Sequence, residues 1–394
     1  MPKPFEIKIN SILGGISPNL FQGRSDQFHA SIGIDPDLAI NDGSAIKTSG
    51  VLRPSGYSDF SGATLSGYPR WFVVPASASS LYVYASDGEL IEYTSVFGGE
   101  LLSGTPQGGD GSGAVFYNNY IYLGTSSSVT RYGPMDTAGP VINSDWWGNE
   151  VAGPALGSAS YPANRSVTLP NKPMHVHNDG RLYFGTYDVS SAVTSTRGRG
   201  MIHRISTFYD GAIEGGVNDG NTQYDVLELP FGYMPTDIES WGTDLVIAAI
   251  PAGSDATFAH GKAKLFFWDT RVNGLGYYRA IDLIDPMCTA LLNSNGNLYV
   301  WSGNMNNGAR VSIYAGGSTL KQLAFFEEGF SPPAGAVDGL GNRIVWGAYT
   351  TYPENTASVY SLGYKDANLP LALHNIINTD SAGANGMVSA LKYV

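Results

Sequence analysis

The sequence has few of the features that would cross-link the chain or place it in a membrane. A single cysteine, Cys288, excludes an intrachain disulfide, and a free cysteine is usually a small buried hydrophobic residue. No apolar run approaches the ~18 residues of a membrane span. The first residues also lack the apolar stretch of about 7–15 residues that a secretory signal needs. We therefore expect a soluble protein that is synthesised in a cytoplasm.

Positively charged residues are also scarce. Only 14% of the residues are charged, and the net charge is −12. Lysine and arginine form no long run anywhere in the chain. This pattern excludes a general nucleic-acid-binding face and favours solubility instead.

Glycine and tyrosine, in contrast, are abundant, at 50 and 24 residues. This composition is typical of many short strands joined by tight turns, and no segment predicts a helix longer than two turns. A turn followed by an apolar strand recurs seven times. The seven units are "SASSLYVYAS" (Leu81), "YNNYIYLGTS" (Ile121), "HNDGRLYFGTY" (Leu182), "SWGTDLVIAAI" (Leu245), "NSNGNLYVWSG" (Leu298), "GLGNRIVWGAY" (Ile344) and, more weakly, "GANGMVSALKYV" (Met387).

The spacing of these units predicts an all-β propeller over residues 61–394. Their anchor residues stand 40 to 63 residues apart, and a four-stranded blade takes about 40–50 residues. The longer intervals indicate insertions near 133–170 and 188–230. Most units are followed by a second strand that ends in an aromatic residue, such as "AKLFFWDT". We expect about seven blades, with six blades or a split barrel as alternatives.

Closure of the ring is the second expectation, because an open ring exposes sheet edges. The last unit is short, so we expect it to supply only some strands of its blade. The remaining strands would come from "GVLRPSGYSDF" or "YPRWFVV". Residues 1–60 are then an N-terminal arm with closure strands.

This arm carries a motif. It reads GG-I-SP, then an arginine and an aspartate, an aromatic residue, and finally "RPSG". This order resembles the start of the tail nozzle, or tail-tubular, proteins of short-tailed bacteriophages. The usual double arginine before Pro-Gly is here "LRPSG". The matching residues are Gly14, Gly15, Ser17, Pro18, Arg24, Asp26, Phe28, Arg53, Pro54 and Gly56.

The resemblance implies a virion protein that assembles into a ring, with six copies, and contacts other tail proteins such as the adaptor and fibres. The residues of the arm agree with a role in contacts. Gly14, Gly15 and Pro18 exclude a stable helix, and the alternation in "FEIKIN" suits a strand that adds to a sheet edge. That edge could belong to the same ring or to a neighbouring subunit.

Catalytic motifs are not evident. "ASDGELIEY" lacks the spacing of the Asp-box turns found in sialidases. No G-x-S-x-G elbow, phosphate-binding loop or H-E-x-x-H helix occurs. Glu327 and Glu328 are adjacent, so they would point to opposite faces of a strand and form no glycosidase pair. We expect no enzymatic activity, no cofactor and no catalytic residue.

Two histidines are candidates for a metal site. His175 and His177 lie two apart and would share one face of a strand, with Asp179 nearby. A metal site is conceivable from these residue types. Two imidazoles without a third ligand favour surface or pore-lining histidines, so we expect no metal.

The insertions carry the remaining candidates. Trp146 and Trp147 could stack on a sugar ring or pack against another subunit, and we favour the subunit contact. Arg197 and Arg199, in a Gly-rich segment, could touch DNA phosphates, although a solvated loop needs no such role.

The sequence thus predicts a structural protein of a phage virion, in the nozzle or lower tail tube through which DNA passes. Acidic residues facing the lumen would repel the DNA and let it slide. The alternatives are a propeller that binds a receptor or glycan on the virion surface and a propeller glycoside hydrolase.

Overall fold

The protein is described by a computed structural model that places the chain from residue 69 onward with gaps at the connecting segments. The N-terminal arm lies outside the described residues. These are 69–75, 80–93, 100–101, 111–125, 129–137, 140–147, 173–188, 199–205, 227–251, 261–271, 276–304, 308–314, 316–326, 334–340, 343–350, 356–363, 371–377 and 392.

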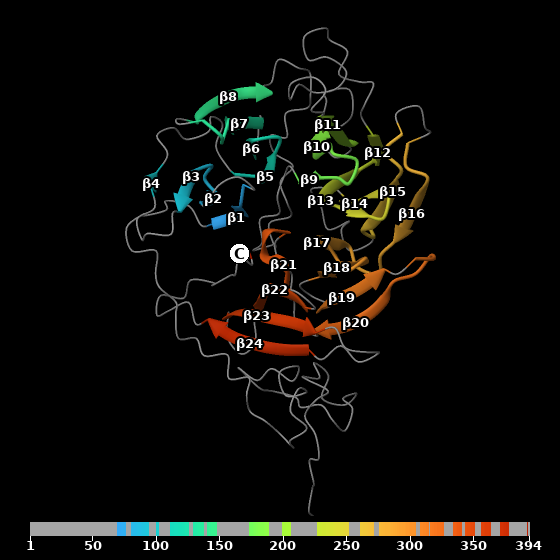
Figure 1. Ribbon diagram of the computed structural model, residues 1–394. Helices are drawn as coiled ribbons and strands as arrows, with labels where there is room; N and C mark the ends of the chain where they lie inside the picture. The colour runs from blue at the N-terminus through green and yellow to red at the C-terminus, as the bar shows by residue number, and fades with distance from the viewer. Residues whose placement is uncertain are drawn as a thin grey trace, which may run out of the picture.

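Six antiparallel four-stranded sheets form a six-bladed β-propeller, and Figure 1 shows them arranged around a common centre. Blade 1 contains β1 (Pro69–Val73), β2 (Leu81–Ala85), β3 (Leu90–Tyr93) and β4 (Glu100–Leu101). Blade 2 contains β5 (Gly113–Tyr117), β6 (Tyr120–Gly124), β7 (Val129–Gly133) and β8 (Val141–Trp147). Blade 3 contains β9 (Met174–Val176), β10 (Leu182–Asp188), β11 (Arg199–Ile205) and β12 (Leu227–Phe231).

The second half repeats this plan. Blade 4 contains β13 (Tyr233–Trp241), β14 (Asp244–Pro251), β15 (Lys264–Trp268) and β16 (Arg279–Asp282). Blade 5 contains β17 (Met287–Ser294), β18 (Asn297–Asn304), β19 (Gly308–Tyr314) and β20 (Lys321–Phe326). Blade 6 contains β21 (Val337–Leu340), β22 (Arg343–Thr350), β23 (Thr356–Gly363) and β24 (Leu371–Ile377), and the short 3-10 helix η4 (Ala334–Ala336) precedes it.

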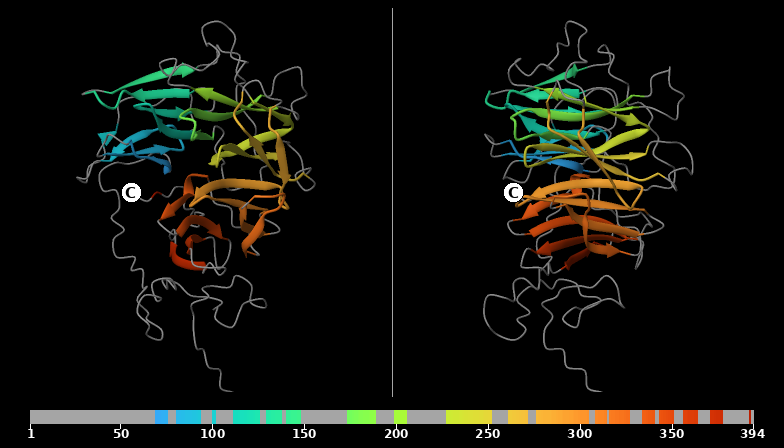
Figure 2. Two further views of the ribbon diagram at one scale, coloured as in Figure 1. Left: turned by 45° about the vertical axis from the view of Figure 1, so that its right-hand side comes forward. Right: turned by 90° about the vertical axis from the view of Figure 1, so that its right-hand side faces the viewer.

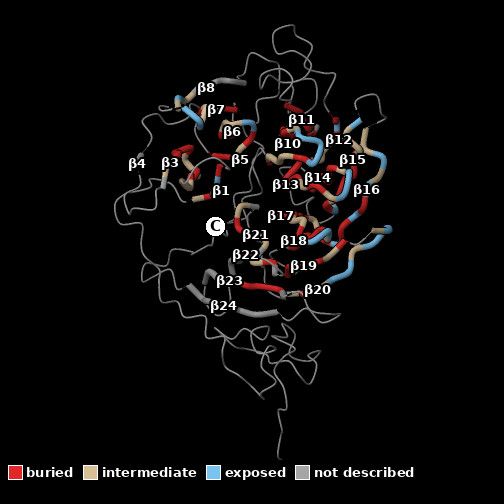
Figure 3. The backbone as a smooth tube through the Cα atoms, in the orientation of Figure 1, coloured by how far each residue is buried: buried red, intermediate tan, exposed pale blue. Residues whose placement is uncertain are grey.

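Within every blade the first strand lies innermost and the fourth outermost. The first strands of successive blades contact one another around the centre, from β1 through β5, β9, β13 and β17 to β21, and η4 contacts both β1 and β17. In the side view of Figure 2 the strands run across the thickness of the disc. Figure 3 shows that the inner and middle strands are mostly buried, whereas β16 and β20 have exposed stretches.

The repeated unit is the second strand of a blade. Six of the seven units fall on β2, β6, β10, β14, β18 and β22, and the aromatic-ended segments that follow them form the third strands. The weak unit at Met387 lies outside the described residues. The estimate of about seven blades is therefore replaced by the six-blade alternative.

These second strands read as continuous apolar runs because both faces are buried. On β14, Leu245 and Ile247 pack toward blade 3, whereas Val246 and Ala248 pack toward blade 5. On β18, Tyr299 and Trp301 face blade 6 in the same way. Alternate residues of a strand point to opposite faces, so β6, β10, β14 and β18 each contribute to two inter-blade cores.

The turn that leads into β18 follows the local chemistry of its residues. Asn295 and Gly296 both have positive φ, 52° and 79°, and they form the two-residue connection between β17 and β18. Asparagine and glycine are the residues that tolerate such a turn. The pattern "NSNGNL" therefore specifies the hairpin by itself.

The described residues test only part of the predicted ring closure. Each of the six described sheets consists of four consecutive strands, so none of them combines strands from the two ends of the chain. "YPRWFVV" does not complete the last blade, because it forms β1 and begins blade 1. Cys288 is fully buried in β17, as the sequence predicted.

Candidate functional site in the central channel

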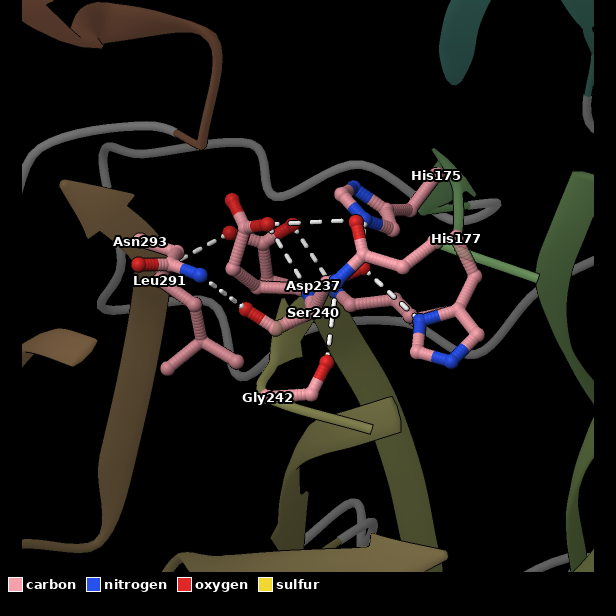
Figure 4. A network of polar contacts seen from close by, with 10 residues as sticks. His175, His177, Asp237, Ser240, Gly242, Leu291 and Asn293 are labelled. Carbon is pink, nitrogen blue, oxygen red and sulfur yellow. Dashed lines mark hydrogen bonds and ion pairs between the residues drawn. The ribbon is translucent and has the colours of Figure 1, made fainter. Parts of the chain in front are cut away.

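A group of mutually bonded polar side chains lies where the inner strands of blades 3, 4 and 5 meet. We call it the channel cluster. Figure 4 shows that its side chains come from β9 and the residue after it, from β13, and from β17. Its members are His175, His177, Asp237, Glu239, Ser240 and Asn293.

The Ser240 hydroxyl is the centre of the cluster. Its Oγ lies 2.6 Å from Nε2 of His175 and 2.8 Å from Nδ1 of His177. Ser240 itself is buried, and so is His177. The side-chain amide of Asn293 donates to the Ser240 carbonyl at 2.8 Å. One serine of blade 4 is thereby bonded to both neighbouring blades.

A neutral imidazole donates a hydrogen bond at one ring nitrogen and accepts one at the other. The Ser240 hydroxyl has one proton and lies within hydrogen-bond distance of both rings, so it donates to one imidazole and accepts from the other.

The two carboxyl groups of the cluster are held by backbone amides. The Leu291 amide of β17 donates to Oδ2 of Asp237 at 2.7 Å, and the Ile238 amide donates to Oδ1 at 2.9 Å. The Ser240 amide donates to Oε1 of Glu239 at 2.8 Å. A carboxyl that bonds the backbone of the next blade fixes the two inner strands against each other.

Burial sets the protonation of the cluster. It raises the pKa of Glu239 to about 7 and the pKa of Asp237 well above its usual value. It lowers the pKa of His175 to about 4 and also lowers the pKa of His177. His175 Nε2 lies 3.4 Å from Oε1 of Glu239. Between about pH 4 and 7 both groups are neutral, so this contact is a dipolar contact and not an ion pair.

A cavity of about 240 Å³ opens beside the cluster. Its wall includes His175, Asp237 and Glu239 together with Trp71 of β1 and Asp338 of β21, and it does not include Ser240. Lys392 also lines the cavity, and its Nζ lies 3.1 Å from Oδ1 of Asp338. The side chain of Asp338 is only 13% exposed.

A second polar cluster lies between blades 4 and 5. Arg310 of β19 forms a bidentate ion pair with Asp285: Nε donates to Oδ2 at 2.6 Å and Nη2 donates to Oδ1 at 3.0 Å. The Ser302 hydroxyl also donates to Oδ2 at 2.7 Å. This geometry satisfies both carboxylate oxygens. It fastens the connection that leads into blade 5.

The inner strands are also joined at β-bulges. The register of β13 shifts at Thr236, and the register of β17 shifts at Thr289. The buried Thr236 hydroxyl donates to the carbonyl of Cys288 at 2.6 Å. A bulge at Arg70 of β1 similarly lets this side chain donate to the Gly111 carbonyl at 2.8 Å, just before blade 2. A bulge re-aims a side chain, and here it points toward the next blade.

The predicted histidine pair is pore-lining in part. His175 lines the channel cavity, whereas His177 is buried with its Nδ1 facing Ser240. Asp179 does not join them, because its Oδ2 accepts from the Tyr183 hydroxyl at 2.6 Å. Within the part of the chain that the structure describes, no three histidine, cysteine or acidic side chains are grouped as metal ligands.

The other predicted site residues are placed only in part. Trp146 and Trp147 end the outer strand β8 of blade 2, so this stretch of the 133–170 region is a blade strand and not an inserted loop. Arg199 begins β11 and is not in a loop. Arg197, Glu327, Glu328 and the arm residues Gly14, Gly15, Ser17, Pro18, Arg24 and Asp26 lie outside the described residues.

The sequence patterns did not identify Ser240 or the two carboxyl groups of β13 as site residues. A signal was present in "PTDIESWG", where Asp237 and Glu239 are two apart in a predicted strand segment. Acidic side chains at alternating positions of a buried strand require partners. Their partner strands could not be read from the sequence, because β9 and β17 lie more than 45 residues away.

Comparisons with known proteins bear on the fold alone. No family model and no curated protein matches the sequence. Similar solved structures include the WD40 domain of Pan2 from Neurospora crassa, at 9% identity over 78% of this chain and 79% of that one, with a TM-score of 0.44. The β-propeller domain of Cps50 (Swd1) from Myceliophteria thermophila has 11% identity over 81% and 89%, with a TM-score of 0.46.

A third similar structure is a putative 6-phosphogluconolactonase from Bacteroides uniformis. It has 14% identity over 78% of this chain and 85% of that one, with a TM-score of 0.48. These likenesses carry no argument about function. The described residues also contain no helix with the length and apolar character needed to cross a membrane.

Proposed function

We propose that this propeller is a structural protein of a bacteriophage virion, a ring-forming part of the tail nozzle or lower tail tube through which DNA passes. The observation that carries the proposal is the motif in the N-terminal arm, from Gly14 and Gly15 through Arg24 and Asp26 to "RPSG". This order of residues resembles the start of the tail nozzle family.

The use of polar groups in the channel supports a mechanical role. Ser240, Asp237 and Asn293 form hydrogen bonds that join blades 3, 4 and 5. The Arg310–Asp285 pair and the Thr236 bond join blades 4 and 5 again. Polar groups that are fully satisfied rigidify a fold. A rigid block of this kind suits a tail component that must hold its shape while DNA passes.

The arm and the connecting segments would lock neighbouring subunits, and Trp146 and Trp147 on the outer strand β8 are candidates for this contact. The acidic balance of −12 would keep DNA sliding in the lumen of the assembled ring. Six copies, other tail proteins as partners and a location in the virion tail follow from the resemblance.

Native mass spectrometry and negative-stain imaging of the purified chain test the proposal. We expect a closed ring, alone or with the adaptor protein of the tail. A chain that stays monomeric with tail partners present contradicts the proposal. A lumen lined mainly by lysine and arginine would contradict the sliding mechanism while leaving the tail assignment intact.

A hydrolase is a second candidate, because Ser240 Oγ lies 2.8 Å from a histidine nitrogen. Against it, Ser240 is buried and is not part of the cavity wall, where His175 stands instead. A nucleophile must reach its substrate. Turnover of an ester, lactone or glycoside by the purified chain that is lost in Ser240→Ala would establish the hydrolase.

Glycan binding through Trp146 and Trp147 is the other alternative. A glycan array with the purified chain and with the Trp146→Ala, Trp147→Ala double variant distinguishes it from the subunit contact. Binding that depends on both tryptophans supports a receptor-binding propeller. Ring formation without glycan binding supports the nozzle.

A further inference from the structure

The channel cavity is lined by groups that complement an alkyl ammonium ion. Three carboxyl groups line it, those of Asp237, Glu239 and Asp338. Leu291, Val337 and Trp71 also line it, although polar groups make up most of its surface. A lysine side chain combines a charged head with an aliphatic stem, and such a chain packs against apolar surface while its head stays near polar groups.

A lysine of the chain occupies this position. Nζ of Lys392 lies 3.1 Å from Oδ1 of Asp338, and the Asp338 side chain is largely buried. Among the described residues that line the cavity, Lys392 is the only lysine or arginine.

The position of this contact matters for the ring. Asp338 belongs to blade 6, Glu239 to blade 4 and Trp71 to blade 1, and all three line the same cavity. The described strands of blades 6 and 1 share no sheet. A side chain that enters the cavity therefore lies between the first and last blades without adding a strand to either.

We propose that Lys392 is a latch: its side chain is 40% exposed, but its ammonium group pairs with Asp338 at the carboxyl-lined cavity and so ties residue 392 to blade 6. The cavity is then a site for a primary ammonium group, and it accepts a small alkylamine once Lys392 is removed. This inference does not depend on the proposed tail function, because it concerns only the contact between Lys392 and the cavity.

Carbodiimide coupling tests the latch directly, because the reagent joins a carboxyl and an amine only when they meet. The Asp338 carboxylate adds to the carbodiimide, the Lys392 amine displaces the activated oxygen, and the reagent leaves as a urea. At neutral pH we expect an amide between Lys392 and Asp338 in the full chain, located by peptide mass spectrometry. Absence of this cross-link overturns the latch.

Labelled methylamine in the same reaction tests the site. In the unaltered chain Asp338 should escape labelling. In Lys392→Ala the cross-link is lost and methylamine should label Asp338 or Glu239 in a saturable way. In Lys392→Arg the cation still fills the cavity but the guanidinium does not couple, so neither the cross-link nor the label should appear. Equal labelling of Asp338 in all three chains refutes the ammonium site.

A matched control lies on the outer part of blade 4. Nζ of Lys264 is 2.5 Å from Oδ1 of Asp282, and both residues lie far from the channel in the fold. This pair should cross-link equally in all three chains, which shows that the reagent is active and blade 4 is folded. Loss of the Lys264–Asp282 cross-link in Lys392→Ala would show that Lys392 is needed for folding of the blade, and the Lys392→Arg result then decides the proposal.

Discussion

Replacing Glu239 with glutamine should change how the stability of this propeller depends on pH. Glu239 is buried beside His175, and its pKa rises from an ordinary value of 4.5 to about 7. Between these two values the folded chain keeps a proton that the unfolded chain has lost. Stability from this group is therefore fully present below pH 4.5 and is lost as pH rises through about 7.

His175 has the opposite effect over nearly the same range. Burial lowers its pKa from 6.5 to about 4, so the unfolded chain binds a proton that the folded chain excludes. Its contribution rises with pH between about 4 and 6.5 and is lost as pH falls. The two neighbours thus compensate each other, and together they leave stability nearly level between about pH 4.5 and 6.5.

The magnitude follows from the two shifts. One pKa unit corresponds to about 1.4 kcal/mol, so each group contributes on the order of 3 kcal/mol across its range. The Glu239 side chain is 16% exposed and the His175 side chain 21%, so solvent screening is limited. His177, Asp237 and Lys392 also face this pair. All three residues are still present in a Glu239→Gln chain, so the substitution removes only the Glu239 carboxyl group.

Glu239→Gln keeps the side-chain oxygen that accepts from the Ser240 amide and removes only the titration. Relative to the unaltered chain, its free energy of unfolding should rise by about 3 kcal/mol between pH 4.5 and pH 8. Urea unfolding followed by tryptophan fluorescence at a series of pH values measures this difference. Glu228→Gln, at an exposed position of β12, controls for the loss of one acidic charge.

If the free energy of unfolding of the Glu239→Gln and unaltered chains changes with pH in parallel, the reasoning is refuted. Glu239 would then have the same pKa in the folded and unfolded chains. A His175→Gln chain provides the mirror test. It removes the compensating group, so its stability should fall as pH rises from about 4.5 to 7, whereas the Glu239→Gln chain should gain stability over most of that range.

Three further substitutions test the contacts between blades. Ser240→Ala removes the shared hydroxyl and leaves a buried imidazole nitrogen without its partner, so the free energy of unfolding should fall by about 1–3 kcal/mol, measured in urea. Arg310→Met leaves the buried Asp285 carboxylate unpaired and should cost about 3–5 kcal/mol, and adding Asp285→Asn should recover part of that loss. Gly111→Ala would place a methyl group against the carbonyl oxygen of Ala85, and the shift of a strand that this requires should lower the melting temperature.

Much of the fold could be predicted because the signals are local. The apolar second strands, the turn at Asn295 and Gly296 and the aromatic-ended third strands are each specified by residues that are neighbours in the sequence. The outer strands were harder to recognise. Trp146 and Trp147 were assigned to an insertion because β8 follows a break in the repeat, and a strand at the edge of a blade needs no strong pattern of its own.

The sequence by itself determined the all-β class, the propeller and the burial of Cys288, since period-two patterns and turn residues act over short distances. Only the tertiary structure decided that the described chain forms six blades of consecutive strands, and that Ser240 meets His175 and His177. Those contacts join inner strands from different blades, separated by about 65 residues. Which strands become neighbours around the channel depends on closure of the whole ring, and no local pattern carries that information.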